Sequence, residues 1–309
     1  VVSFIGYAQQ FGGQNRQLTQ VVTQVLSAIA GANRVFEILD RDPVIADAPD
    51  AHAMPTAEGK VDFNHVDFRY TKKHQILFDN DFHVTPGQLI GLVGPTGAGK
   101  STIINLLTRF YDIESGEIQL DDRNIVDINL NHLRQRCGVV LQVPFLFTET
   151  VMYNLQYGRD GATPDECIAA AERAGAHRFI ERLPHGYDTV LTGGGEALSQ
   201  GQRQLLTIAR AIVADPDVLI LDEATSSVDT RTERRIQRAL DSLMEGRTSF
   251  VIAHRLSTVR DADAIIVLDS GRIQEMASHD ELMAARGYYY ALYMEQFRPE
   301  FVDAFAVPH

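Results

Sequence analysis

The chain has 309 residues, enough for one large or two modest domains, and its 45% hydrophobic content is ordinary for a globular protein. The net charge of -13 argues against a nucleic-acid partner, because binding a polyanion rewards clustered Lys and Arg. The two cysteines, Cys137 and Cys167, fit no metal spacing or disulfide framework, so we interpret them as packed thiols in a reducing compartment. We find no continuous apolar run long enough for a membrane span and no signal-peptide pattern.

The first segment is unusual because Arg16 is the only charged residue between Val1 and Asn33. Residues 15–39 are predicted to be helical because apolar side chains recur at helical spacing, at Leu18, Val22, Val25, Ile29 and Phe36. The lack of charge elsewhere suggests that the other face is covered too, and an ordinary buried helix and a membrane-proximal helix both fit. Since the sequence begins with Val1 and not with methionine, we expect a fragment or a processed product.

Residues 41–60, rich in Pro, Ala and Asp, indicate a linker. Apolar residues then recur at every second position, which predicts strands over 61–70 and 75–84. Later segments alternate between short apolar strands and helices, with helix dominating residues 145–214 and a hairpin around Ser270 and Gly271. This order predicts an α/β fold with a parallel sheet and antiparallel additions.

A phosphate-binding loop is predicted by GPTGAGKS, which matches G-x-x-x-x-G-K-[ST] between a strand and a helix. Its glycines let successive backbone amides wrap an anion, and the helix that follows directs its positive end at the same charge. Lys100 is expected to reach the β- and γ-phosphates, and Ser101 to hold Mg²⁺. The predicted nucleotide-binding residues here are Gly94, Pro95, Thr96, Gly97, Ala98, Gly99, Lys100, Ser101 and Thr102.

A second element of the same chemistry is VLILDE, residues 218–223, an apolar strand that ends in two acids. In open α/β sheets, ligands lie at the carboxyl ends of the strands. Asp222 is therefore expected to hold Mg²⁺, and Glu223 to accept a proton from the attacking water.

A second helix start of the phosphate-binding kind lies in LSQGQ, residues 198–202. Ser199 and Gln202 form the S-x-x-Q pattern of a capping box, so a well-capped helix is a sufficient explanation on its own. Together with the loop and the acidic pair, however, LSQGQ resembles the signature motif of ATP-binding-cassette (ABC) ATPases.

This resemblance implies a P-loop NTPase core with a parallel sheet, an antiparallel β subdomain and an inserted helical subdomain at about 145–214. It also implies that two domains pair head to tail, so that Ser199, Gln200, Gly201 and Gln202 contact ATP held by the partner domain. One chain then carries half of each of two sites, which explains two phosphate-binding helix starts.

Other family motifs are matched residue by residue. Tyr70 matches the aromatic residue that stacks on adenine, and Gln142 matches the glutamine that contacts Mg²⁺ and the attacking water. Asp229, in SSVD, matches the loop that crosses the dimer interface, and His254 matches the switch histidine at the γ-phosphate. Taken singly, each of these residues also fits a structural role.

The resemblance covers residues 61–296 as the nucleotide-binding domain and leaves 297–309 as a tail. Residues 1–40 are similar to the end of a transmembrane-domain helix and its connector in an exporter. The implied function is ATP hydrolysis, with ATP and Mg²⁺, that powers export. The implied partners are a second nucleotide-binding domain and the chain's own transmembrane domain, with the chain at the cytoplasmic face of the cell or inner membrane.

One departure concerns Gln200, because the commonest signature has glycine there. A side chain now lies where the backbone approaches a phosphate. The chain could belong to a heterodimer with one weakened site, and a homodimer that tolerates Gln200 is an equal alternative.

Three rival functions were weighed. A chromosome-maintenance or DNA-repair ATPase is disfavoured, because no coiled coil separates Lys100 from Asp222. An importer's ATPase subunit is disfavoured by the segment before residue 41. A nucleotide-sensing switch without turnover is disfavoured because Glu223 and His254 are both present.

Overall fold

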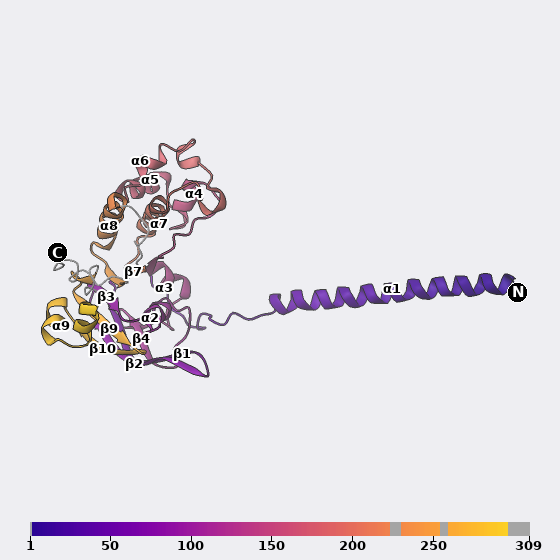
Figure 1. Ribbon diagram of the computed structural model, residues 1–309, viewed down its shortest axis with the longest axis horizontal. Helices are drawn as coiled ribbons and strands as arrows, with labels where there is room; N and C mark the ends of the chain where they lie inside the picture. The colour runs from indigo at the N-terminus through magenta and orange to yellow at the C-terminus, as the bar shows by residue number, and fades with distance from the viewer. Residues whose placement is uncertain (1, 223–229, 254–258, 296–309) are drawn as a thin grey trace, which may run out of the picture. The chain divides into compact units, whose positions relative to one another are not determined.

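The computed structural model describes residues 2–222, 230–253 and 259–295, and the chain divides into two compact units, Val1–Ala46 and Asp47–His309. The first unit consists mainly of the helix α1, Val2–Leu39, which extends the predicted helix toward the N-terminus (Figure 1). No side chain of this helix is buried within the unit. In the described ranges, no helix is both long enough and apolar enough to cross a membrane.

The second unit is organised around a mostly parallel sheet. Among the described residues this sheet has the strand order β10-β9-β3-β8-β7-β6, with only the β9–β10 hairpin antiparallel. Its strands are β3 (Leu89–Val93), β6 (Cys137–Val140), β7 (Val218–Asp222), β8 (Thr248–Ile252), β9 (Ala264–Asp269) and β10 (Arg272–Ala277). The predicted α/β core with antiparallel additions is confirmed.

The parallel strands are buried on both faces, which is why they are continuous apolar runs in the sequence. In β7, Val218 and Ile220 pack into a core shared with the antiparallel sheet, while Leu219 and Leu221 pack into a core shared with the helices. The sheet therefore separates two hydrophobic cores.

The antiparallel sheet has the order β2-β1-β4-β5 and is built from β1 (Val61–Thr71), β2 (His74–Val84), β4 (Ser115–Leu120) and β5 (Arg123–Asn124). Alternation along β1 places Val61, Phe63, Val66 and Phe68 in the core. The pairing of β1 with β2 shifts register between Phe68 and Thr71. This irregularity lies where the strand reaches Tyr70.

Helices fill the interval between β6 and β7, as the periodicity predicted. Figure 1 shows α4–α7 gathered together, and α7 packs against the sheet through the core that it shares with β7. The elements are α4 (Val151–Gln156), α5 (Pro164–Arg173), α6 (His177–Ile180), η1 (Gly186–Asp188), η2 (Thr192–Gly194) and α7 (Gln200–Ala214). The remaining helices are α2 (Lys100–Leu107), α3 (Leu130–Arg136), α8 (Thr230–Met244) and α9 (His279–Ala285), and residues 288–295 are also helical.

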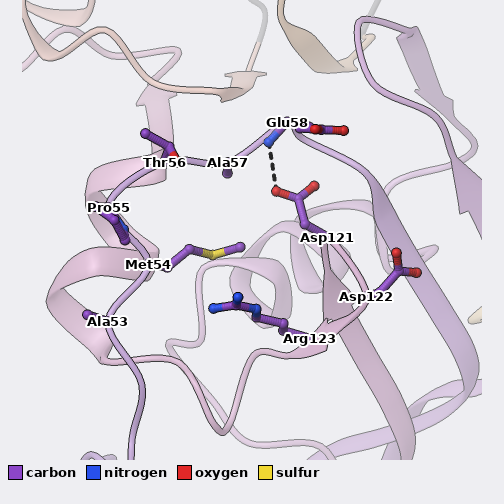
Figure 2. Close-up of a pocket in the computed structure, with 9 residues that line it drawn as sticks. All are labelled: Ala53, Met54, Pro55, Thr56, Ala57, Glu58, Asp121, Asp122 and Arg123. Carbon is purple, nitrogen blue, oxygen red and sulfur yellow. Dashed lines mark hydrogen bonds between the residues drawn. The ribbon is translucent and has the colours of Figure 1, made fainter.

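The predicted linker does not lie free over its whole length, because residues 47–60 belong to the second unit. The carboxylate of Asp121 accepts hydrogen bonds from the backbone amides of Glu58, Gly59 and Lys60, at 2.7, 3.0 and 2.8 Å. Figure 2 shows the hydrogen bond from the Glu58 amide to this carboxylate. Both residues line a pocket of about 570 Å³. Met54 is buried beside it. Residues 58–60, at the end of the predicted linker, are thus fastened to the β4–β5 turn.

Candidate ATP site

The phosphate loop joins the end of β3 to the start of α2, in the strand–loop–helix context that the sequence predicted. Gly94, Gly97 and Gly99 have φ values of 144°, 84° and 107°, in the region that favours glycine. A Cβ on Gly94 would lie 2.0 Å from the carbonyl oxygen of Leu268. Glycine is therefore required at Gly94 both for the turn and for the close approach of β9.

The first turn of α2 presents its amides to the same loop. Gly99 is the N-cap and has no side chain to cap the helix, while the amides of Thr102 and Ile103 donate back to its carbonyl oxygen. A helix start of this kind attracts an anion, because uncapped amides and the helix dipole both offer positive charge.

Lys100 is folded over the loop that precedes it. Its Nζ donates hydrogen bonds to the carbonyl oxygens of Gly94, at 2.8 Å, and Pro95, at 3.0 Å. Burial lowers the pKa of Lys100, and the carboxylate of Asp222 at the end of β7 opposes that shift. A phosphate that takes the place of the two carbonyl oxygens would give this buried cation an anionic ligand.

Tyr70 lies beside the phosphate loop. Its hydroxyl oxygen is 3.2 Å from the Thr102 hydroxyl and accepts a hydrogen bond from the Asn105 amide, also at 3.2 Å. Its ring packs edge to face against Phe68 and Tyr111, each with a centroid separation of 4.8 Å. The ring is therefore held at a fixed height while 44% of the residue stays exposed, as a stacking platform requires.

These groups surround one cavity of about 300 Å³. Its lining residues come from β1, β2, the phosphate loop, α2 and β8, namely Tyr70, Ile76, Thr96, Gly97, Gly99, Lys100, Ser101, Thr102 and Ile252. The structure thus brings together the predicted adenine platform and the predicted phosphate loop. Asp222 pairs with Ile252 in the sheet register and ends its strand at this edge.

The second predicted phosphate-binding helix start is the N-terminus of α7. Ser199 Oγ accepts a hydrogen bond from the Gln202 amide, and Gln202 Oε1 accepts one from the Ser199 amide, so the predicted capping box is present. Gln200 is the first residue of the helix and is not among the described residues with positive φ. Glycine is therefore not needed there for backbone conformation, and Gln200 affects only how closely a ligand can approach.

The structure describes only some of the remaining predicted site residues. Gln142 lies exposed in a bend directly after β6, and Gly201 is buried within α7. Glu223, Asp229 and His254 lie outside the described residues.

Comparisons with known proteins agree with this geometry. Residues 77–226 match the family described as ABC transporter. The chain is 50% identical over 96% of its length to an uncharacterised ABC transporter ATP-binding protein of Bacillus subtilis (strain 168), covering 49% of that protein. It is 47% identical over 94% of its length to a fatty acid ABC transporter ATP-binding/permease protein of Mycobacterium bovis (strain ATCC BAA-935 / AF2122/97), covering 46% of it.

A solved structure shows the same fold. A bacterial Atm1-family ABC exporter with ATP bound superposes with a TM-score of 0.82 at 41% identity, over 88% of this chain and 48% of that one. This chain belongs to the ABC transporter family. It carries an ATP-binding, ATP-hydrolysing domain of the exporter type, and it spans about half the length of the curated relatives it matches.

Sequence reasoning missed several residues around this ABC ATPase site. Asn105 and Tyr111 hold Tyr70, and Ile76 and Ile252 close the cavity. Asn105 lies between the apolar pairs 103–104 and 106–107 of α2, and a polar side chain at that place was the available signal. The contributions of Ile76 and Ile252 depend on strand pairing, for which the sequence offers no local signal.

Proposed function

We propose that this chain is the ATPase half of an exporter in which two such domains pair head to tail and bind two ATP molecules between them. The observation that carries the proposal is the cavity that joins Tyr70 to the phosphate loop, together with a second capped helix start at Ser199 outside that cavity. Tyr70 would stack on adenine, and residues 94–102 would hold the phosphates.

Mg²⁺ is the proposed metal, because the available donors are hard oxygen atoms. Ser101 is the second residue of α2 and is exposed, Asp222 ends β7 and Gln142 follows β6. The described residues contain no cluster of three or more acidic, His or Cys side chains able to hold a metal. A site that takes most of its ligands from phosphate and water fits this donor set, and the ion would neutralise charge on the phosphates.

Hydrolysis is proposed to depend on Glu223 as the base for the attacking water, with Gln142 and His254 arranging the γ-phosphate. Lys100 would offset charge that develops on the transferring phosphoryl group. The signature residues 199–202 and Asp229 would complete the site on the partner domain. Closure over ATP and reopening after hydrolysis would then move the membrane portion between its two accessible states.

The second domain could be a second copy of this chain or a related one. Because Gln200 causes no backbone strain, we favour a pair in which the signature of this chain remains able to close over nucleotide. A heterodimer with one weaker site stays the alternative, and unequal hydrolysis at the two sites would favour it.

We propose that the membrane portion docks on an apolar groove of about 290 Å³ between the sheet and the helices. The groove is lined by Leu141, Phe145 and Tyr157, which are 53%, 59% and 60% exposed. The occupant would be a segment of a permease portion, such as the one that the name of the Mycobacterium bovis relative includes. The proposed location is the cytoplasmic face of the membrane, with α1 as the end of a transmembrane-domain helix.

The proposal is tested by measuring ATP hydrolysis against protein concentration for the wild type and Glu223→Gln, with the mass of each determined in Mg·ATP. We expect a rate per molecule that rises with concentration and a variant that accumulates as an ATP-bound dimer. A rate per molecule that is independent of concentration, from a chain that stays monomeric in ATP, would contradict the paired mechanism.

A further inference from the structure

Arg210 joins three segments of the helical part of the domain. It lies on α7, and its Nε and Nη2 donate hydrogen bonds to the backbone oxygen and the Oδ1 of Asn154, at 2.8 and 2.7 Å. Its Nη1 donates to the carbonyl oxygen of Phe145 at 3.1 Å. The planar guanidinium thus uses donors on both edges, a geometry that lysine cannot reproduce.

Asn154 extends this connection along the segment that follows Gln142. Its Oδ1 also accepts a hydrogen bond from the Phe147 amide at 2.9 Å, and its Nδ2 donates to the carbonyl oxygens of Phe147 and Thr150. Asn154 is 1% exposed, so these bonds are shielded from water. Residues 145–150 are therefore fastened to α4 and, through Arg210, to α7.

The surroundings of Arg210 make this connection stiff. Its guanidinium lies over the rings of Phe147 and Tyr157, 5.5 and 5.8 Å from their centroids. Burial lowers the pKa of Arg210, and the Coulombic effect of the Tyr157 phenolic group opposes that shift. Removing one partner of a buried charged hydrogen bond costs more than removing an exposed one, because the remaining groups lose their solvation.

This connection links two parts of the proposed catalytic machinery, the segment after Gln142 and the helix that follows Ser199. Phe145 follows Gln142 by three positions, and α7 begins next to Ser199, about 16 Å along the helix axis from Arg210. Arg210 does not line the cavity that holds Tyr70 and Lys100, so nucleotide binding does not depend on it directly.

We infer that Arg210 is a positioning residue for hydrolysis, which ties the segment after Gln142 to the signature helix so that Gln142 and Ser199 move together. The inference rests on the proposed function, in which Gln142 acts at the γ-phosphate and Ser199 contacts the partner's ATP. Loss of the hydrogen bonds made by the Arg210 guanidinium would let Gln142 move away from the γ-phosphate while ATP still binds.

The test is a double-mutant cycle on the full-length transporter in lipid vesicles, with Arg210→Lys, Gln142→Ala and the double variant. We expect Arg210→Lys to lower kcat about tenfold with KM for ATP changed by less than about twofold. On the Gln142→Ala background, Arg210→Lys should lower kcat no further. ATP bound per chain, measured by titration, reports the folded fraction, which we expect to be the same in all variants.

Arg173→Lys is the matched control, because the hydrogen bond that Arg173 of α5 donates goes to the carbonyl oxygen of Ser242 on α8 and to neither of the two segments. Its kcat should equal that of the wild type. Independent, multiplicative losses in the double variant, or equal losses of kcat and of bound ATP in Arg210→Lys, would overturn the inference. A wild type that does not hydrolyse ATP would instead contradict the proposed function itself.

Discussion

The backbone amide of Gly271 donates a hydrogen bond to the carbonyl oxygen of Ala98 at 3.1 Å, so the turn between β9 and β10 braces the phosphate loop. The carbonyl oxygen of Gly271 in turn accepts hydrogen bonds from the Phe78 amide and the Asn80 side chain, both at 2.9 Å. One residue of the hairpin thus connects the phosphate loop to the antiparallel sheet that carries Tyr70.

Gly271→Ala should weaken ATP binding. Its φ is +78°, and a Cβ would lie 1.9 Å from the carbonyl oxygen of Ile76, so the turn must move away from the loop. Gly246→Ala is the matched control, because Gly246 has a φ of +74° and open space around its Cβ position. We expect the control to lose only about 1 kcal/mol of stability and to bind ATP normally by calorimetry. Equal ATP affinities in the two variants would contradict the bracing role.

Tyr70→Leu should raise the dissociation constant for ATP about tenfold, because base–aromatic stacking contributes about 1–3 kcal/mol. Tyr70→Phe keeps the ring and loses only the contacts of the hydroxyl with Thr102 and Asn105. We expect it to bind ATP within about threefold of the wild type. If Tyr70→Phe lost as much affinity as Tyr70→Leu, the hydroxyl contacts and not the ring would set ATP affinity.

Asp121→Ala should release residues 58–60 from the β4–β5 turn. Three backbone amides lose their acceptor, for which we expect a fall in the free energy of unfolding of about 2 kcal/mol or more. Asp122→Ala is the control, because Asp122 also has positive φ but makes only an exposed ion pair with the Lys60 side chain, of a kind that contributes little to stability. Urea unfolding measures the free energy of unfolding of both variants. Equal falls in the two variants would contradict the anchoring role of Asp121.

Asp67 should make the free energy of unfolding depend on pH in the acidic range. Hydrogen bonds from the Ser115 hydroxyl, the Asp79 amide and the Gln75 side chain keep the pKa of Asp67 below its usual 3.8, against the opposing effect of burial. Because the folded-state pKa is depressed, this stabilisation is present above pH 3.8 and is lost as pH falls through the folded-state pKa. The difference in unfolding free energy between wild type and Asp67→Asn should therefore shrink on acidification. A difference independent of pH would contradict this assignment.

Patterns that repeat along the chain predicted most of the fold. The period of two marked β1, the glycine-rich loop marked the junction of β3 and α2, and S-x-x-Q marked the start of α7. The helix α3 and the strand β6 were missed. Leu133 is the only buried residue of α3, and β6 has only four residues, including Gly138, so neither has enough periodicity to detect.

The residues that hold the site together were harder to predict than the residues that bind. Lys100 and Ser199 belong to short local motifs, whereas Gly271, Asp121 and Arg210 act on segments distant in sequence. In the sequence, Gly271 and Asp121 indicate only turns, and Arg210 is one more polar residue on a helix. Long-range pairing assigns their roles, and one sequence does not encode that pairing in a form that periodicity can detect.

The central claim is that Lys100 and Ser199 of different chains act on the same ATP. It is tested most directly by a disulfide between chains. Thr96 and Ser199 are both exposed, and the native Cys137 and Cys167 are buried. Burial raises the pKa of Cys137 to about 12 and raises that of Cys167, so neither should compete in oxidation.

Thr96→Cys in one tagged chain and Ser199→Cys in a second, differently tagged chain should form a cross-linked pair when ATP is added and hydrolysis is blocked by Glu223→Gln. The amount of cross-linked pair should rise with ATP and should fall when Lys100→Ala is added to the Thr96→Cys chain. A cross-link that forms equally without ATP, or none at all in an ATP-saturated mixture, would contradict the composite site.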